Sequence, residues 1–125
     1  MVDYKVIFHL DENDPQRINL VLNNLNNLMQ DMGEENLELE LVTYGPGLQL
    51  FLKGSPFFPH MESLAQKGVI FAGCGNTLKG MGVAVEELLD SVQVVPSGVG
   101  SWLKSSTRAG FISDPELFFN HIYFL

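Results

Sequence analysis

Short apolar runs alternate along this chain with stretches of helical periodicity, and this alternation restricts the possible folds more than any other feature of the sequence. The apolar runs are rich in β-branched and aromatic residues and end at Gly, Pro or acidic residues, which is typical of strands. Five strands are expected: Tyr4–Leu10, a second in residues 36–45 ending near Thr43, then 69–74, 92–98 with a stop at Pro96, and a short one at 111–113. Helices are expected at 15–33, 48–54, 59–68, 83–91 and 99–110.

This order of elements predicts how the strands pair. Strands that alternate with helices over short connections form right-handed crossovers, and these produce a mainly parallel sheet with helices on both faces. The run "VIFAGC" is apolar throughout, as expected for a strand covered on both faces. We therefore predict an α/β fold, a three-layer α/β/α sandwich with a mainly parallel sheet of about five strands.

The first long helix has clear boundaries in the sequence. Apolar residues recur at helical spacing from Ile18 to Met32. Asp14 is expected as the N-cap, Pro15 as a first-turn residue and Gly33 as the C-terminal stop.

Length and charge exclude several classes of protein. The 125 residues are expected to form a single domain, 1–125, with an apolar C-terminal extension at about 114–125. Seven basic against 15 acidic residues give a formal charge of −8, which disfavours nucleic acid and anionic membranes as partners. No signal peptide or bilayer-spanning run is recognised, and the single cysteine needs no oxidising compartment, so a cytoplasmic location is expected.

The candidate site lies where the strands end, because parallel sheets bind ligands outside the carboxyl ends of their strands. Cys74, the single cysteine, ends the third expected strand in "GCGNT". If Asn76 or Thr77 caps the next helical turn, free N–H groups beside the sulfur favour its thiolate, and Lys79 acts in the same direction. Cysteine is also among the most buried residue types, so a structural role remains equally open.

Three further residues are weaker candidates. His9 ends the first strand and suits a proton shuttle, although a buried histidine satisfied by a neighbour is more common. Tyr44 faces the same crevice or packs beside the Gly-Pro-Gly turn. Asn24, with Asn23, serves the crevice, an oligomer contact or a solvated helix face. No metal-ligand spacing and no nucleotide-binding motif is present, so no metal or cofactor is expected.

Six segments, taken together, resemble a known family: "VIFHLDE", "VLNNLNNLM", "LELVTYGPGLQLFLKGSP", "LAQKGVIFAGCGNTLKGMGV", "ELLDSVQVVPSGVGSWLK" and "AGFI". They are similar to the DsrE/DsrF-like proteins, small α/β proteins with the YchN-like fold, over nearly the whole chain to about Ile112. The most specific part is "CGNTLKGMG" followed by "VVPSGV". The resemblance implies homo-oligomers, commonly trimers or hexamers.

The resemblance also implies a chemistry. In the sulfur-relay members, a cysteine at this strand end carries sulfur as a persulfide between donor and acceptor proteins, and that role falls on Cys74. Asn76, Thr77 and Lys79 belong to the same motif without an assigned role. Tyr44 stands where such relatives often have His, and the apolar tail 114–125 replaces a shorter ending. We expect this tail to pack on its own subunit or on a neighbour.

Three functions therefore remain open at this stage. The first is an intracellular sulfur carrier that acts through a Cys74 persulfide. The second is a non-catalytic oligomeric binding or scaffold protein in which Cys74 only lines the crevice. The third is a redox sensor that uses Cys74 oxidation, which requires a thiol from another chain because this one has a single cysteine.

Overall fold

A computed structural model of the protein describes residues 4–98 and the backbone of residues 122–124. In chain order these residues form β1 (Tyr4–Leu10), α1 (Pro15–Met32), the 3₁₀ turn η1 (Glu34–Asn36), β2 (Leu37–Thr43), the 3₁₀ helix η2 (Gly45–Phe51), α2 (Phe58–Gln66), β3 (Ile70–Cys74), α3 (Gly75–Met81), the 3₁₀ turn η3 (Val85–Glu87), β4 (Val92–Val95) and β5 (Ile122–Phe124).

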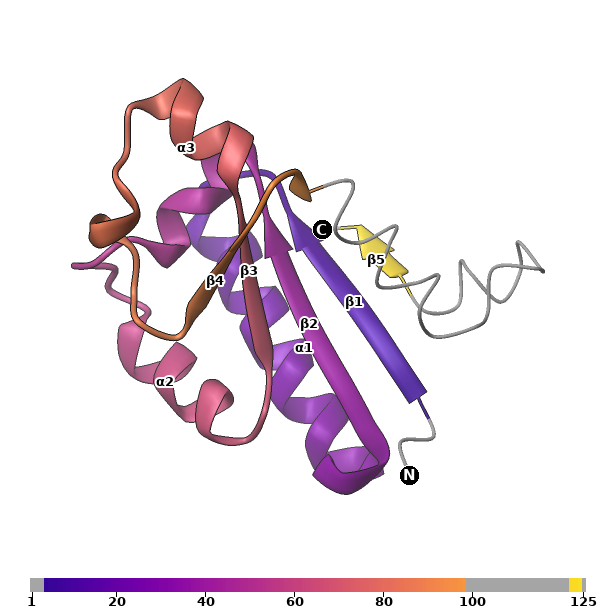
Figure 1. Ribbon diagram of the computed structural model, residues 1–125. Coiled ribbons are helices and arrows are strands. Elements are labelled where there is room, and N and C mark those ends of the chain that lie inside the picture. Colours follow the sequence, from indigo (N-terminus) through magenta and orange to yellow (C-terminus); the bar gives the residue numbers. More distant parts are fainter. Residues whose placement is uncertain (1–3, 99–121, 125) are drawn as a thin grey trace, which may run out of the picture.

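The strands form one sheet in the order β4-β3-β2-β1-β5, and every pairing is parallel. Figure 1 shows α1 running behind the strands and α3 at the end to which the arrowheads of β1 and β2 point. The predicted α/β fold with a parallel sheet is therefore confirmed. The strand expected at 111–113 lies outside the described residues, and β5 comes instead from the C-terminal tail, where it pairs with β1.

Alternate residues of the strands face opposite sides of the sheet. One side meets α1, α2 and η2 in the main core, where Phe8, Leu25, Leu41, Met61 and Phe71 are buried. On the other side Ile7, Val42 and Ala72 form a second cluster, each at most 1% exposed. Residues of β1, β2 and β3 are thus buried on both sides of the sheet, as expected for central parallel strands. The helix expected to cover the second face, at 99–110, lies outside the described residues.

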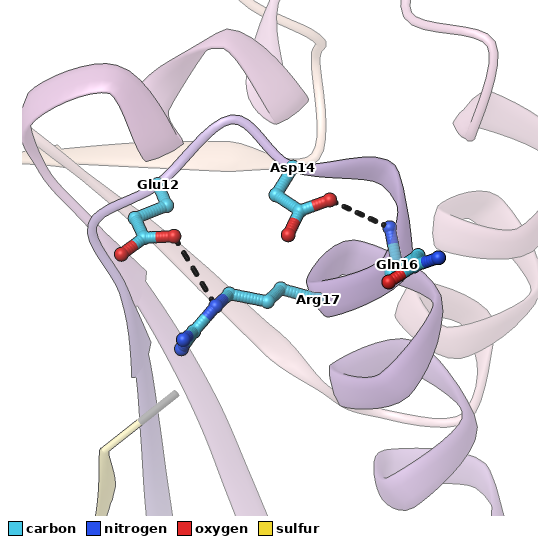
Figure 2. A network of polar contacts seen from close by, with 4 residues as sticks. All are labelled: Glu12, Asp14, Gln16 and Arg17. Atoms are coloured by element: carbon cyan, nitrogen blue, oxygen red, sulfur yellow. Dashed lines mark hydrogen bonds and ion pairs between the residues drawn. The ribbon is translucent and has the colours of Figure 1, made fainter.

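Helix α1 begins and ends where its sequence signals predict. Asp14 is the N-cap and accepts a hydrogen bond from the N–H of Gln16 at 3.1 Å, while Gly33 is the C-cap. Figure 2 shows this cap beside the ion pair of Arg17 with Glu12, whose Nε and Oε2 atoms lie 3.2 Å apart. Both charged side chains are about half exposed, so the cap contributes more to stability than the ion pair does.

Two helical assignments from the sequence need correction. The break at Gly45 is already the first residue of η2, so the short helix overlaps the expected range of 48–54 but begins and ends before it. The helix expected at 83–91 is wrong: within it the structure has one 3₁₀ turn, η3. The N–H of Leu89 donates to the carbonyl of Phe51, and the N–H of Lys53 to that of Glu87, so the segment is held extended against η2.

The remaining elements lie close to their predicted ranges. Strands β1 and β2 match, β3 starts at Ile70, β4 ends at Val95, and α2 spans Phe58–Gln66. Among the described residues, no helix has the length and apolar character needed to cross a membrane.

Candidate functional site

The candidate site lies at the carboxyl edge of the sheet, where β3 passes into α3 without a loop. Cys74 is the last residue of β3, paired with Val95 of β4, and is also the N-cap of α3 with φ −74° and ψ 118°. The sequence reasoning that gave the cap to Asn76 or Thr77 is therefore wrong by two or three residues. The helix starts directly at Gly75, so Asn76 and Thr77 lie inside its first turn.

The thiol of Cys74 is buried but surrounded by hydrogen-bond donors. The residue is 5% exposed. Burial raises the pKa of the thiol, whereas the Thr77 hydroxyl and the N–H groups of Thr77, Gly98 and Asn76 lower it, and the net shift of the pKa is downward. The sulfur makes no capping hydrogen bond of standard geometry, so these donors act as a loose electrostatic cage. Such a cage favours the thiolate, which is the nucleophilic form.

Thr77 connects this cage to the end of β2. Its Oγ1 accepts a hydrogen bond from the N–H of Gly45 at 2.9 Å, across 32 positions of sequence. In the parallel register Thr43 pairs with Gly73, so the following residue, Tyr44, lies beside Cys74 at the strand ends. The side chain of Thr77 therefore occupies the junction between the β2–η2 turn and the cysteine.

His9 and Tyr44 form a second pair at the same edge. Tyr44 Oη and His9 Nδ1 share a hydrogen bond of 2.9 Å, and the rings stack with centroids 5.6 Å apart. Burial lowers the pKa of His9 against an opposing effect of Asp11, while burial and Asp11 both raise the pKa of Tyr44. Both side chains are therefore neutral at pH 7, and the pair is a packed polar contact.

Gly98 approaches both Cys74 and the Tyr44 side chain. Its N–H is one of the donors that act on Cys74. A Cβ atom on Gly98 would lie 3.1 Å from Cβ and Cδ1 of Tyr44, which is tighter than ordinary contact. The absence of a side chain at this position lets the segment after β4 approach both the tyrosine ring and the sulfur.

The structure separates the other predicted residues from this cage. Asn24 lines a cavity of about 430 Å³ with Phe8 and Leu28, on the side of the sheet that faces α1. Cys74 belongs to the opposite side, since it follows Ala72 by two residues. Lys79 is exposed in the last turn of α3. The groups that lower the pKa of Cys74 are the N–H and O–H donors of Thr77, Gly98 and Asn76, and Lys79 is not one of them.

Sequence reasoning missed two contributors to the site, Gly98 and Asp11. Both belong to the strand ends that the parallel topology brings together, so their location was available from the sequence. Their roles could not be predicted from the sequence, because Gly98 acts through its backbone N–H and Asp11 acts through its charge on His9 and Tyr44. Within residues 4–98, no group of three or more His, Cys, Asp or Glu side chains is placed to hold a metal ion.

Comparison with known proteins agrees with this fold. The sequence profile of the DsrE/DsrF-like family matches residues 5–110, which include Cys74 and, apart from Tyr4 of β1, the strands β1 to β4. The chain belongs to the DsrE/DsrF-like family. The match covers all or nearly all of every described element of this DsrE/DsrF-like protein except β5.

Solved structures support the same conclusion. A protein of unknown function from Methanobacterium thermoautotrophicum is 37% identical, with a TM-score of 0.81, over 86% of this chain and 95% of that one. A conserved protein of unknown function from Bacteroides thetaiotaomicron is 14% identical, with a TM-score of 0.66, over 97% of this DsrE/DsrF-like chain and 94% of the other, and shows the shared fold alone. No curated protein matches.

Proposed function

We propose that this DsrE/DsrF-like protein is an intracellular sulfur carrier in which Cys74 holds sulfane sulfur as a persulfide. The observation that supports the proposal is the set of donors around Cys74, because they lower the pKa of a thiol that burial alone would keep protonated. A thiolate is the species that attacks sulfur in exchange reactions. Membership of the family agrees with a role of this type.

The transfer step needs no external oxidant. The Cys74 thiolate attacks the outer sulfur of a donor persulfide, R–S–SH, and a bond forms between Cys74 Sγ and that sulfur. The bond between the donor's two sulfurs breaks, and the donor leaves as the thiolate R–S⁻ while the proton stays on the transferred sulfur. An acceptor thiolate then removes the sulfur by the same step and regenerates the Cys74 thiolate.

Mass spectrometry of the native protein tests this proposal. After incubation with sodium polysulfide and removal of excess reagent, we expect one added sulfur on Cys74 that dithiothreitol removes. Cys74→Ser is the matched control and must stay unmodified, because the chain has no other cysteine. A wild-type protein that gains no sulfur while folded, but gains it in denaturant, would refute the carrier function.

The proposal includes an assembly and a location. We expect a homo-oligomer, a trimer or hexamer, that works in the cytoplasm with separate donor and acceptor proteins. A reducing compartment keeps the single thiol available for exchange. Light scattering coupled to size exclusion measures the subunit number, and a strictly monomeric protein would contradict this part of the proposal.

A binding or scaffold function is the second candidate, and the low exposure of Cys74 favours it. At 5% exposure the side chain also suits a small apolar lining residue. Under this alternative, Cys74→Ser retains the partners that co-purify with the wild-type protein from its native host. Under the carrier function, the same variant loses sulfur transfer to any acceptor.

A further inference from the structure

The hydroxyl of Thr77 is fixed from one side. It lies at the third position of α3, and Cys74 is the N-cap of that helix. In a capping box the side chains of these two positions each reach the backbone N–H of the other residue, so both side chains lie at the same start of the helix. On its other side, Thr77 Oγ1 accepts the 2.9 Å hydrogen bond from the N–H of Gly45.

A threonine hydroxyl has one hydrogen to donate and two lone pairs. Because the N–H of Gly45 can only donate, one lone pair of Oγ1 is occupied and the hydroxyl hydrogen must point elsewhere. We propose that Thr77 is a positioning residue for Cys74, whose hydroxyl is oriented by Gly45 so that its hydrogen points at the sulfur.

This role deepens the proposed function and rests on it for its importance in sulfur transfer. Cys74 is a thiolate before it accepts sulfur and again after it has passed sulfur on. A fixed hydroxyl that donates to the sulfur stabilises the charged form at both stages without having to reorient. The β2–η2 turn thereby determines the reactivity of a cysteine that lies on a different strand.

The direct test measures the thiolate and does not need a sulfur donor. The rate of Cys74 alkylation by iodoacetamide is followed from pH 5 to 10 in the folded protein. Thr77→Val keeps the shape of the side chain and removes the hydroxyl, so we expect alkylation at pH 7 to slow about three- to tenfold and the profile to move to higher pH. Thr77→Ser restores the hydroxyl and returns the profile toward that of the wild type.

Thr43→Val is the matched control. Thr43 is a fully buried threonine at the end of β2, on the opposite side of the sheet from Cys74. Its substitution should leave the alkylation profile unchanged. A change equal to that of Thr77→Val would show a general effect of removing a hydroxyl and would overturn the proposal.

Other outcomes are equally clear. An unchanged profile in Thr77→Val overturns the role of the hydroxyl, and so does a Thr77→Ser variant that behaves like Thr77→Val. If Thr77→Val does not fold, Thr77→Ala is measured instead, and failure of both to fold makes the hydroxyl structural and overturns the proposal. Failure of the carrier function would be recognised separately, because the wild-type protein would then gain no sulfur from polysulfide.

Discussion

The hydroxyl oxygen of Tyr44 lies 2.9 Å from Nδ1 of His9, and the two rings stack at an interplanar angle of 22°. The contact joins the ends of β1 and β2, which are adjacent in the sheet. Figure 1 shows both strand ends on the side of the molecule that carries α3. The pair therefore stabilises the edge on which Cys74 lies, while its polar atoms bond to each other.

Tyr44→Phe tests what this hydrogen bond contributes. The change removes the hydroxyl and leaves Nδ1 of a buried histidine without that partner, so we expect the free energy of unfolding to fall by about 1–2 kcal/mol. Urea denaturation measures the loss. Tyr4→Phe is the control, because Tyr4 is 47% exposed, and it should change stability by less than about 0.5 kcal/mol. Equal effects of the two variants would contradict a stabilising role for the pair.

His9 gives the protein a pH-dependent stability. Burial lowers its pKa below 6.5, although Asp11 opposes this shift, so the folded state binds the proton less readily than the unfolded state. The stability from neutral His9 is fully present above about pH 6.5 and is lost as the pH falls through the lowered pKa. We expect His9→Gln to flatten the pH dependence of the free energy of unfolding between pH 7.5 and 5.

The control for this prediction is His60→Gln in α2, which removes a histidine far from Tyr44 in the sequence. Carboxylates also alter stability over this pH range, so the quantity that matters is the difference in slope between the two variants. If His60→Gln flattens the curve as much as His9→Gln does, the buried edge histidine is not its cause.

The packing of α1 provides a third prediction. Leu25 is fully buried against the sheet, whereas Leu20 on the same helix is 49% exposed. Leu25→Ala should lower the free energy of unfolding by about 2–5 kcal/mol, because it removes buried methyl groups and leaves a cavity. Leu20→Ala should cost less than about 1 kcal/mol. Equal losses in urea denaturation would show that α1 presents a different face to the sheet.

Local signals explain why part of this fold was predictable. The cap at Asp14, the proline at Pro15 and the stop at Gly33 act within a few residues, so the ends of α1 were correct. The apolar spacing of residues 83–91 suggested a helix, but Leu88 instead forms an antiparallel bridge with Leu52. That bridge joins distant parts of the chain, and tertiary contacts of this kind override local periodicity.

Helix α3 was considered only as a helical turn capped by Asn76 or Thr77, and its full extent was missed for the converse reason. Its sequence "GNTLKGM" contains two glycines, which are poor helix formers, and the helix ends at Gly82 in the left-handed conformation. Its buried Leu78 packs into the main core, which compensates for the weak propensity. The edge position of Cys74 and the free N–H groups of the following helical turn were predicted from the sequence, but the N–H of Gly98 was not, because it comes from the segment after β4.

The last prediction concerns Gly98, whose missing side chain allows its N–H to act on Cys74. In Gly98→Ala the new Cβ would lie 3.1 Å from the Tyr44 side chain, which is tighter than ordinary contact, and we expect the segment after β4 to move away from the strand ends in response. Loss of one donor from the cage should raise the pKa of the thiol and slow its alkylation at pH 7 about two- to fivefold. Gly80→Ala in α3 is the control, since its added Cβ would meet no atom beyond its chain neighbours and its own helix backbone within 4 Å. It should leave alkylation unchanged while stabilising the helix by about 0.5–1 kcal/mol. Alkylation of Gly98→Ala at the wild-type rate would show that the Gly98 N–H does not contribute to the thiolate.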